Sequence, residues 1–223
     1  MENAGKRCVA EIIGTFTLVF VGAGSICMGA YDHTLGTLGV AVAHGLALSV
    51  MISALMAVSG AHFNPAVTFG FLLTGRIGTG MAGLYALSQL TGGVVAAYLL
   101  RMIFSDVWRD MYLGTPMING DAGITTAQAV LVEMILTFFL VVVVFGTAVD
   151  SRAPKIAGFA IGLTVTADIL MGGALTGAAM NPARAFGPAL AAGIWDVHYV
   201  YWIGPLLGGG LAALLYHHLM MER

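Results

Sequence analysis

The chain has 223 residues, of which 59% are hydrophobic and 9% are charged, and its formal net charge is −2. A soluble domain carries about 25% charged residues, so the 9 basic and 11 acidic side chains of this chain cannot cover a globule of its size in water. No basic run indicates a nucleic-acid partner. The two cysteines, Cys8 and Cys27, form no disulfide framework. Composition therefore predicts an integral membrane protein.

Six stretches are long and apolar enough to cross a hydrocarbon core about 30 Å thick, for which a helix needs about 20 residues. They lie at about 8–30, 38–59, 81–104, 127–149, 155–173 and 199–220. The first stretch is too long for the apolar part of a signal peptide and contains Glu11, so we interpret it as a retained helix.

The distribution of basic residues predicts the orientation in the membrane. If both termini are cytoplasmic, most basic residues lie inside, namely Lys6, Arg7, Arg76, Arg152, Lys155 and Arg223. Only Arg101 and Arg109 then lie outside. We therefore expect a multi-pass protein of the cell membrane with cytoplasmic N- and C-termini.

The two halves of the chain resemble each other. Residues 59–70 (SGAHFNPAVTFG) and 176–187 (TGAAMNPARAFG) share seven of twelve positions, and a nearby offset aligns Glu11 with Glu133. Each half contains three spans, an odd number, so the second copy must be inverted in the membrane. We expect a single channel domain over 1–223, with inverted repeats at about 1–105 and 125–223 and a substrate path at their interface.

The repeated NPA element is the most informative motif. Asparagine is a favoured N-cap, and proline at the first helical position loses no needed donor, so each NPA predicts a helix start. The apolar run from Ala66 to about Thr74 predicts a helix of about 11 residues, roughly 16 Å or half a bilayer. The motif residues are Asn64, Pro65, Ala66, Asn181, Pro182 and Ala183.

Two such half-helices, entering from opposite faces, would meet N-terminus to N-terminus at the midplane. Each N-terminus carries about half a positive charge, so the facing ends form a barrier to cations. The amides of Asn64 and Asn181 can both donate to one water oxygen and orient that water so that it relays no proton. The alternative, that Asn-Pro merely caps two short re-entrant helices, is disfavoured because the element recurs in inverted halves.

With these residues the chain resembles aquaporins of the major intrinsic protein family over essentially its whole length. The double NPA, the following Arg184 and AEIIGT at 10–15 carry the resemblance. HFNPAVTFG and MNPARAFGPA resemble plant tonoplast members, and GTAVDSRAPK resembles archaeal ones. The resemblance implies an all-α right-handed bundle of six transmembrane helices plus two re-entrant half-helices, one pore per subunit, and a homotetramer. Aquaporins are themselves the standard example of ion exclusion by half-helix dipoles and an arginine.

In this family four positions form a selectivity filter, and by spacing from the motifs they fall on His44, Ile169, Ala178 and Arg184. Ordinary packing is the alternative for Ile169 and Ala178. The set differs from that of strict water channels. Those channels resemble one another in having an aromatic residue at the position of His44 and a histidine at the position of Ile169. It also differs from glycerol facilitators, which have two aromatic residues there. It resembles plant vacuolar members that often pass ammonia as well as water.

The resemblance thus implies a passive channel for water, with ammonia or other small neutral solutes as further permeants, and no enzymatic activity. An inverted-repeat secondary transporter is the alternative. Such a transporter would need an ion-coupling carboxylate beside the two NPA segments, where its helices are interrupted. However, no acidic residue occurs in 60–80 or 169–195. No motif indicates a metal or another cofactor.

Four further polar residues have two interpretations each. Glu11 and Glu133 are interpreted as structural carboxylates that accept hydrogen bonds from backbone N–H groups of the NPA loops, and a proton relay is the alternative. His62 resembles a pore-lining histidine of the family, either a neutral ring that contacts water or a pH sensor. Asp168 either holds His44 or Arg184 by a hydrogen bond or snorkels to the surface.

Overall fold

The computed structural model describes residues 3–222, and within this range the chain forms eight α-helices and no strand. The helices are α1 (Ala4–Met28), α2 (Gly36–Ser59), α3 (Pro65–Leu73), α4 (Thr79–Ile103), α5 (Thr126–Val144), α6 (Ala157–Thr176), α7 (Pro182–Ala192) and α8 (Val200–Leu215). A single π turn extends α5 through Phe145–Val149 and α8 through Tyr216–Met220. Six of these elements are long and apolar enough to cross a membrane. They match the six predicted spans to within a few residues.

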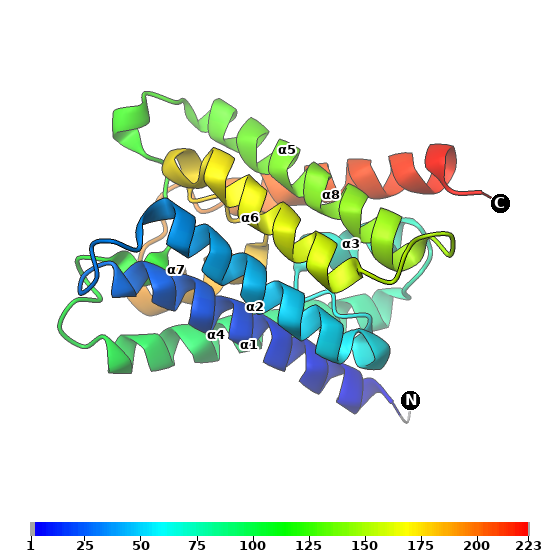
Figure 1. Ribbon diagram of the computed structural model, residues 1–223, viewed down its shortest axis with the longest axis horizontal. Helices are drawn as coiled ribbons and strands as arrows, with labels where there is room; N and C mark the ends of the chain where they lie inside the picture. Colours follow the sequence, from blue (N-terminus) through cyan, green and yellow to red (C-terminus); the bar gives the residue numbers. More distant parts are fainter. Residues whose placement is uncertain (1–2, 223) are drawn as a thin grey trace.

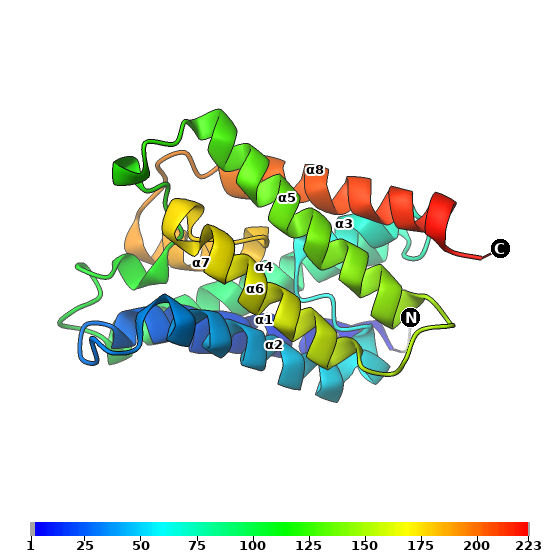
Figure 2. The same ribbon diagram turned by 45° about the horizontal axis from the view of Figure 1, so that its top comes forward.

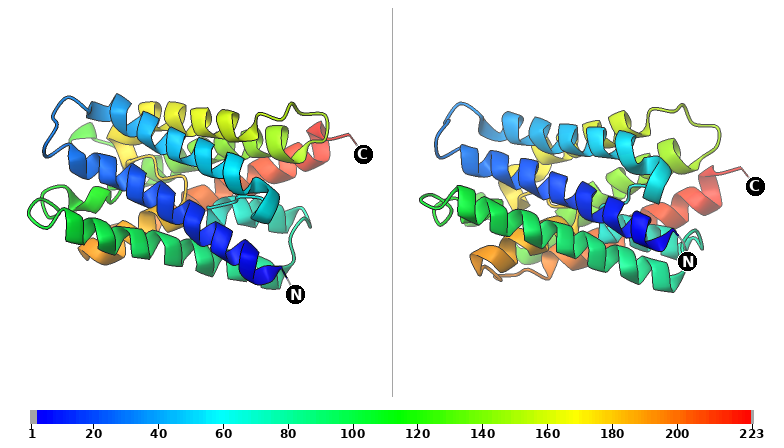
Figure 3. Two further views of the ribbon diagram at one scale, coloured as in Figure 1. Left: turned by 60° about the horizontal axis from the view of Figure 1, so that its bottom comes forward. Right: turned by 90° about the horizontal axis from the view of Figure 1, so that it is seen from below.

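The six long helices surround the two short ones. In Figures 1 and 2, α3 and α7 lie inside the bundle in opposite halves of its long axis. Figure 3 shows both chain termini at the same end of the bundle, as an even number of spans requires. The predicted all-helical fold with two half-length helices is therefore confirmed.

The half-helices begin and end where local sequence dictates. Each begins at a proline that directly follows an asparagine in extended conformation. The α7 helix has 11 residues, whereas α3 has only 9, so the predicted length of the first half-helix was too long. The α3 helix stops early because Gly75, with φ of +68°, takes the chain into left-handed geometry that glycine adopts readily.

Glycine contacts join each half-helix to a spanning helix of the other repeat. A Cβ on Gly187 of α7 would collide with the carbonyl oxygen of Gly93 in α4. In the other repeat, a Cβ on Gly209 of α8 would lie 3.0 Å from the carbonyl oxygen of Ala66 in α3. Small residues of this kind let helix backbones touch within a membrane. The half-helices therefore pack across the repeat boundary, α3 on α8 and α7 on α4.

At the end that holds both termini, an ion pair ties the α5–α6 loop to the end of α8. Arg152 donates from Nε to Asp150 Oδ1 over 2.9 Å and from Nη2 to Oδ2 over 2.6 Å. The same guanidinium donates to the carbonyl of Met220 and pairs with Glu222. The Tyr216 hydroxyl donates to Asp150 Oδ2. The loop and the C-terminal segment are thus fastened together outside the spanning segments.

This ion pair predicts a pH-dependent contribution to stability. The hydrogen bonds from Arg152 hold the pKa of Asp150 well below its usual value, which is about 3.9. A carboxylate with a lowered folded-state pKa stabilises the fold above its ordinary pKa and loses that contribution as the pH falls below it. The melting temperature of Asp150→Asn should therefore lie below that of the wild type at pH 7, and the gap should shrink as the pH is lowered from about 5 to 3. Asp196→Asn, at an exposed carboxylate, is the control, and a gap that stays constant with pH would contradict the prediction.

Candidate functional site: a path through the bundle

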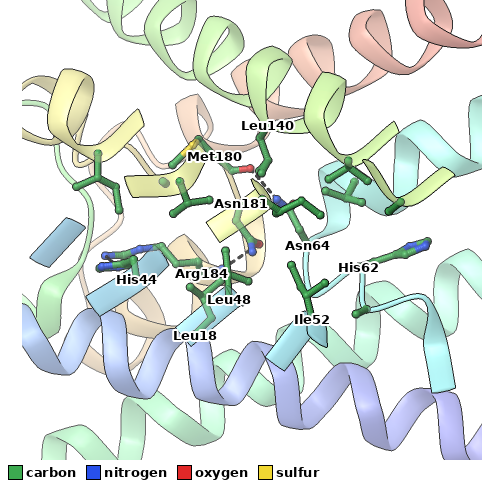
Figure 4. A pocket seen from close by; sticks show the side chains of 18 of the residues that line it. Leu18, His44, Leu48, Ile52, His62, Asn64, Leu140, Met180, Asn181 and Arg184 are labelled. Atoms are coloured by element: carbon green, nitrogen blue, oxygen red, sulfur yellow. Dashed lines mark hydrogen bonds between the residues drawn. The ribbon is translucent and has the colours of Figure 1, made fainter. Parts of the chain in front are cut away.

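A cavity runs between the long helices where the two NPA segments meet. Its lining includes Asn64, Asn181 and the four positions predicted as a filter. The remaining wall is largely apolar, with Leu18, Leu48, Ile52, Leu140, Val144, Ile161 and Val165. Figure 4 shows His44 and Arg184 at one end of the cavity, His62 at the other and the two asparagines between them.

The cavity continues toward both ends of the bundle. Arg184 also lines a pocket formed by 110–120, at the end opposite the termini. His62 also lines a pocket with Arg7 and Arg76, at the end that holds the termini. Shared lining residues thus place the three hollows next to one another along the bundle axis.

The two asparagines share two kinds of hydrogen bond, one to their own half-helix and one to the opposite loop. Asn64 Oδ1 accepts from the backbone N–H of Ala66 at 2.8 Å, and its Nδ2 donates to the carbonyl of Met180 at 2.9 Å. Asn181 Oδ1 accepts from Ala183 at 3.0 Å, and its Nδ2 donates to the carbonyl of Phe63 at 2.8 Å. Each asparagine therefore caps its own half-helix and contacts the loop before the other one. Because an amide nitrogen carries two hydrogens, each retains one that can be offered to a solute in the cavity.

Both loops before the asparagines adopt a backbone conformation that is unusual for their residues. Ala61 and Phe63 in the first loop have φ of 53° and 49°, and Ala178 and Met180 in the second have 43° and 52°. Left-handed geometry costs roughly 1–2 kcal/mol for residues other than glycine. Surrounding contacts must therefore hold these loops in place.

Two buried carboxylates supply those contacts. Glu11 accepts hydrogen bonds from the backbone N–H groups of His62 and Phe63, at 3.0 and 2.7 Å. Glu133 accepts from Ala179 and Met180 at 2.9 and 2.7 Å. Neither carboxylate lines the cavity, and both side chains are fully buried. These contacts support the structural interpretation of the pair over a proton relay.

Further residues that support the two loops were not predicted from the sequence. The hydroxyls of Ser59 and Thr176 donate to Glu11 and Glu133, each at 2.7 Å. Tyr85 and Tyr201 donate in turn to the carbonyls of Ser59 and Thr176. These pairs occupy corresponding repeat positions. Ser59 and Thr176 stand at the start of the two aligned segments, and extending the alignment to Tyr85 and Tyr201 would have pointed to the second pair. Gln89, which donates to Glu11 at 2.8 Å, breaks the pattern because proline stands at the corresponding position 205.

At the filter end, Arg184 is held by contacts from two directions. Its Nη1 donates to the carbonyl of Gly114 at 2.9 Å, and its Nη2 lies 3.3 Å from Nε2 of His44. The His44 ring is fixed from its other nitrogen, which lies 2.8 Å from the carbonyl oxygen of Val40. A Cβ on Gly22 would overlap the imidazole. Glycine at position 22 therefore makes room for the His44 ring.

His62 lies at the opposite end of the cavity among aromatic rings. Its Nδ1 is 3.0 Å from the Thr68 hydroxyl oxygen. Its ring centroid lies 4.2 Å from that of Phe71 and 5.2 Å from that of Tyr85. These contacts fix the side chain at the wall of the cavity.

The prediction for Asp168 was wrong in both forms. Asp168 makes no hydrogen bond to His44 or Arg184, and with 4% exposure it does not snorkel to the surface. The reason is its position on α6, where Ile169 faces the cavity. Gly172, one turn beyond Asp168 on the same face, packs against Leu136 of α5. Asp168 Oδ2 is buried without a hydrogen-bond partner.

The inverted half-helices, the path between them and the six spans define a membrane channel. A family model described as "Major intrinsic protein" matches residues 2–216. The chain is 44% identical to "Aquaporin TIP4-4" of Zea mays, over 98% of this chain and 88% of the relative, and 43% identical to "Probable aquaporin TIP3-2" of Arabidopsis thaliana, over 97% and 84%. Its fold is similar to that of an aquaglyceroporin from Plasmodium falciparum, with a TM-score of 0.86, 23% identity and 97% coverage of both chains.

The chain therefore belongs to the major intrinsic protein family. Members of this family are passive transmembrane channels and not enzymes, and the predictions of family and class are confirmed. Membership of a family of passive channels favours a channel over the alternative prediction of a secondary transporter.

Proposed function

We propose that the protein conducts water passively, together with ammonia or other small neutral solutes, and excludes protons and ions. One observation carries the proposal. The amides of Asn64 and Asn181 lie in one cavity with the Arg184 guanidinium, opposite a largely apolar wall. Water that crosses this path can form hydrogen bonds with the polar side. An ion would lose its hydration shell, and the apolar wall supplies no polar groups that could compensate for that desolvation.

Ion exclusion follows from charge in the same place. The N-termini of α3 and α7 each contribute about half a positive charge, and Arg184 adds a full one. A cation at the centre of the path is therefore repelled from two sides. A water molecule that accepts a hydrogen bond from each asparagine points its own hydrogens away from the centre. A proton therefore cannot pass along the row of water molecules in the path.

The choice of solutes rests on the four filter positions. His44 and Arg184 supply polar contacts, whereas Ile169 and Ala178 are apolar or small. With the small Ala178 and the aliphatic Ile169, the filter has no phenylalanine, tyrosine or tryptophan ring to contact a carbon backbone. This composition favours water and ammonia over glycerol.

We further propose that the protein forms a homotetramer in the cell membrane, with both termini in the cytoplasm. The family supports the tetramer, and the basic residues support the orientation. Arg7, Arg76 and Arg152 all lie at the end of the bundle that holds the termini. Positive charge concentrates in cytoplasmic loops.

Stopped-flow light scattering on proteoliposomes under an osmotic gradient tests the main proposal, with an internal pH dye that reports ammonia entry. We expect fast shrinkage with a low activation energy, and ammonia entry above that of empty liposomes. Water flux equal to that of empty liposomes would overturn the proposal. Water flux without ammonia entry would restrict the permeants to water.

Mercury sensitivity tests the position of Ala178 in the path. The wild type should resist micromolar mercury, because Cys27 is fully buried and does not line the cavity. Ala178→Cys should conduct water and then lose most of that flux with mercury, since the thiol would lie in the filter. Recovery with a reducing thiol is the control. Persistent flux in mercury-treated Ala178→Cys would place residue 178 outside the path.

A further inference from the structure

An aromatic ring flanked by two arginines lies beyond α4, at the end of the bundle opposite the termini. The guanidinium carbon of Arg101 is 4.4 Å from the centroid of the Trp108 ring, and that of Arg109 is 4.6 Å from it. Trp108 is half-buried and packs against the cluster that contains Leu100 and Phe104. The ring is therefore anchored to the bundle and gathers two positive charges around itself.

The position of this group at the end of a candidate span is the level at which lipid headgroups are expected. Arg101 belongs to the last turn of α4, a candidate membrane span. Its neighbours Met102 and Ile103 are 74% and 59% exposed, as expected of side chains that contact acyl chains. Tryptophan concentrates at the membrane–water interface, and arginine near a helix end extends its charge to the same level.

No ion pair among the described residues 3–222 involves Arg101 or Arg109. Both ion pairs in the described range 3–222 involve Arg152, at the other end of the bundle. Two carboxylates follow on the same loop, but Asp106 accepts from Ser105 and Asp110 lines the pocket beside Arg184. Neither of them pairs with Arg101 or Arg109.

One contact fixes Arg101 and leaves most of its donors available. Its Nη1 donates to the carbonyl of Ala191 at 2.8 Å, near the C-terminal end of α7, where the helix dipole is negative. A guanidinium carries five N–H donors, and stacking against a ring leaves its edge exposed. Two such edges suit the oxygens of a phosphate, which arginine binds with paired hydrogen bonds.

We propose that Arg101, Trp108 and Arg109 form a binding site for the phosphate of an anionic phospholipid in the leaflet opposite the termini. The arginines bind the phosphate oxygens, and the acyl chains lie along the exposed apolar side chains at the end of α4. The two guanidinium groups attract an anionic headgroup more strongly than a zwitterionic one.

The test uses the full-length protein in vesicles and follows quenching of tryptophan fluorescence by brominated phospholipids. Brominated phosphatidylglycerol should quench the wild type in excess of brominated phosphatidylcholine, with a preference on the order of fivefold per arginine. Arg109→Gln should lose much of that preference, and the double variant Arg101→Gln/Arg109→Gln all of it. Arg109→Gln is the decisive variant because no hydrogen bond of the Arg109 side chain is seen within residues 3–222, whereas the Arg101 side chain donates to α7. Arg76→Gln, at an arginine over the Phe145 ring at the other end, should keep the preference.

Equal quenching of the wild type by the two lipids would overturn the proposal, as would an unchanged preference in Arg109→Gln. A last experiment adds inorganic phosphate at millimolar concentration and measures whether it competes with the brominated lipid. Lack of competition supports a lipid headgroup. Displacement of the brominated lipid by phosphate would instead indicate a site for soluble anions and would overturn the assignment to lipid.

Discussion

Replacement of Glu133 by alanine is expected to cost several kcal/mol of stability and to abolish conduction. The substitution leaves three buried donors without an acceptor, namely the backbone N–H groups of Ala179 and Met180 and the hydroxyl of Thr176. Each unsatisfied buried donor costs about 1–3 kcal/mol. Their sum is a large share of the 5–15 kcal/mol that is typical of a folded protein.

The loop before Asn181 would be affected first. Ala178 and Met180 have positive φ, and Glu133 holds the segment that contains them. Once released, the loop can relax toward ordinary geometry and withdraw Met180 from its contact with Asn64. Glu133→Gln should be intermediate, because the amide retains one acceptor oxygen but turns a donor toward a donor.

Thermal unfolding in detergent and water flux per folded protein measure both effects. We expect the melting temperature to fall in the order wild type, Glu133→Gln, Glu133→Ala. Asp121→Ala, at an exposed carboxylate, is the matched control and should behave like the wild type. A melting temperature of Glu133→Ala equal to that of the control would refute the structural role.

Replacement of Arg184 by alanine should open the filter to protons and larger neutral solutes while water flux stays of the same order. A unit charge about 4 Å from a cation contributes about 4 kcal/mol at an effective dielectric constant of 20. Because the half-helix dipoles remain, we expect a smaller net loss of barrier, with proton conductance rising by on the order of 100-fold. The lost side chain also widens the path between His44 and Gly114, which the guanidinium now contacts.

Proteoliposomes with an internal pH dye and an imposed potential report the proton leak, and light scattering reports glycerol entry. Arg184→Lys separates charge from shape, since it keeps the charge but lacks the planar fork that contacts two partners at once. We expect the lysine variant to exclude protons and to admit glycerol only slightly. An alanine variant that conducts water and stays tight to both protons and glycerol would remove Arg184 from the filter.

The sequence predicted the parts of the fold that depend on local pattern and on repetition. Hydropathy located the six spans, and NPA located both half-helix starts, because capping by Asn64 and Asn181 depends only on adjacent residues. The repeat also paired Glu11 with Glu133, and inverted symmetry suggested what both would contact. The length of α3 was overestimated because Gly75 was not considered as a helix stop.

The failures concern contacts between segments that are distant in sequence. Because Asp168 precedes Ile169, a hydrogen bond to His44 or Arg184 was one of its two predicted roles. Adjacent residues on a helix point about 100° apart, and here they face different neighbours. Gln89 has no counterpart in the repeat, so symmetry could not find it. The Gly114 carbonyl that holds Arg184 belongs to a loop without a recognisable motif. Its position follows only from the folded chain.

Packing across the repeat boundary has a consequence for biosynthesis. The first half-helix is complete at residue 73, but the surface on which it packs belongs to α8, which begins at residue 200. Asn64 must likewise wait for the carbonyl of Met180. While the ribosome adds the intervening residues, the first re-entrant segment can contact α1 and α4 but lacks α8 and Met180. Its full set of contacts therefore forms only after α8 has been synthesised. Completion of the path is therefore a late event in the life of the nascent chain.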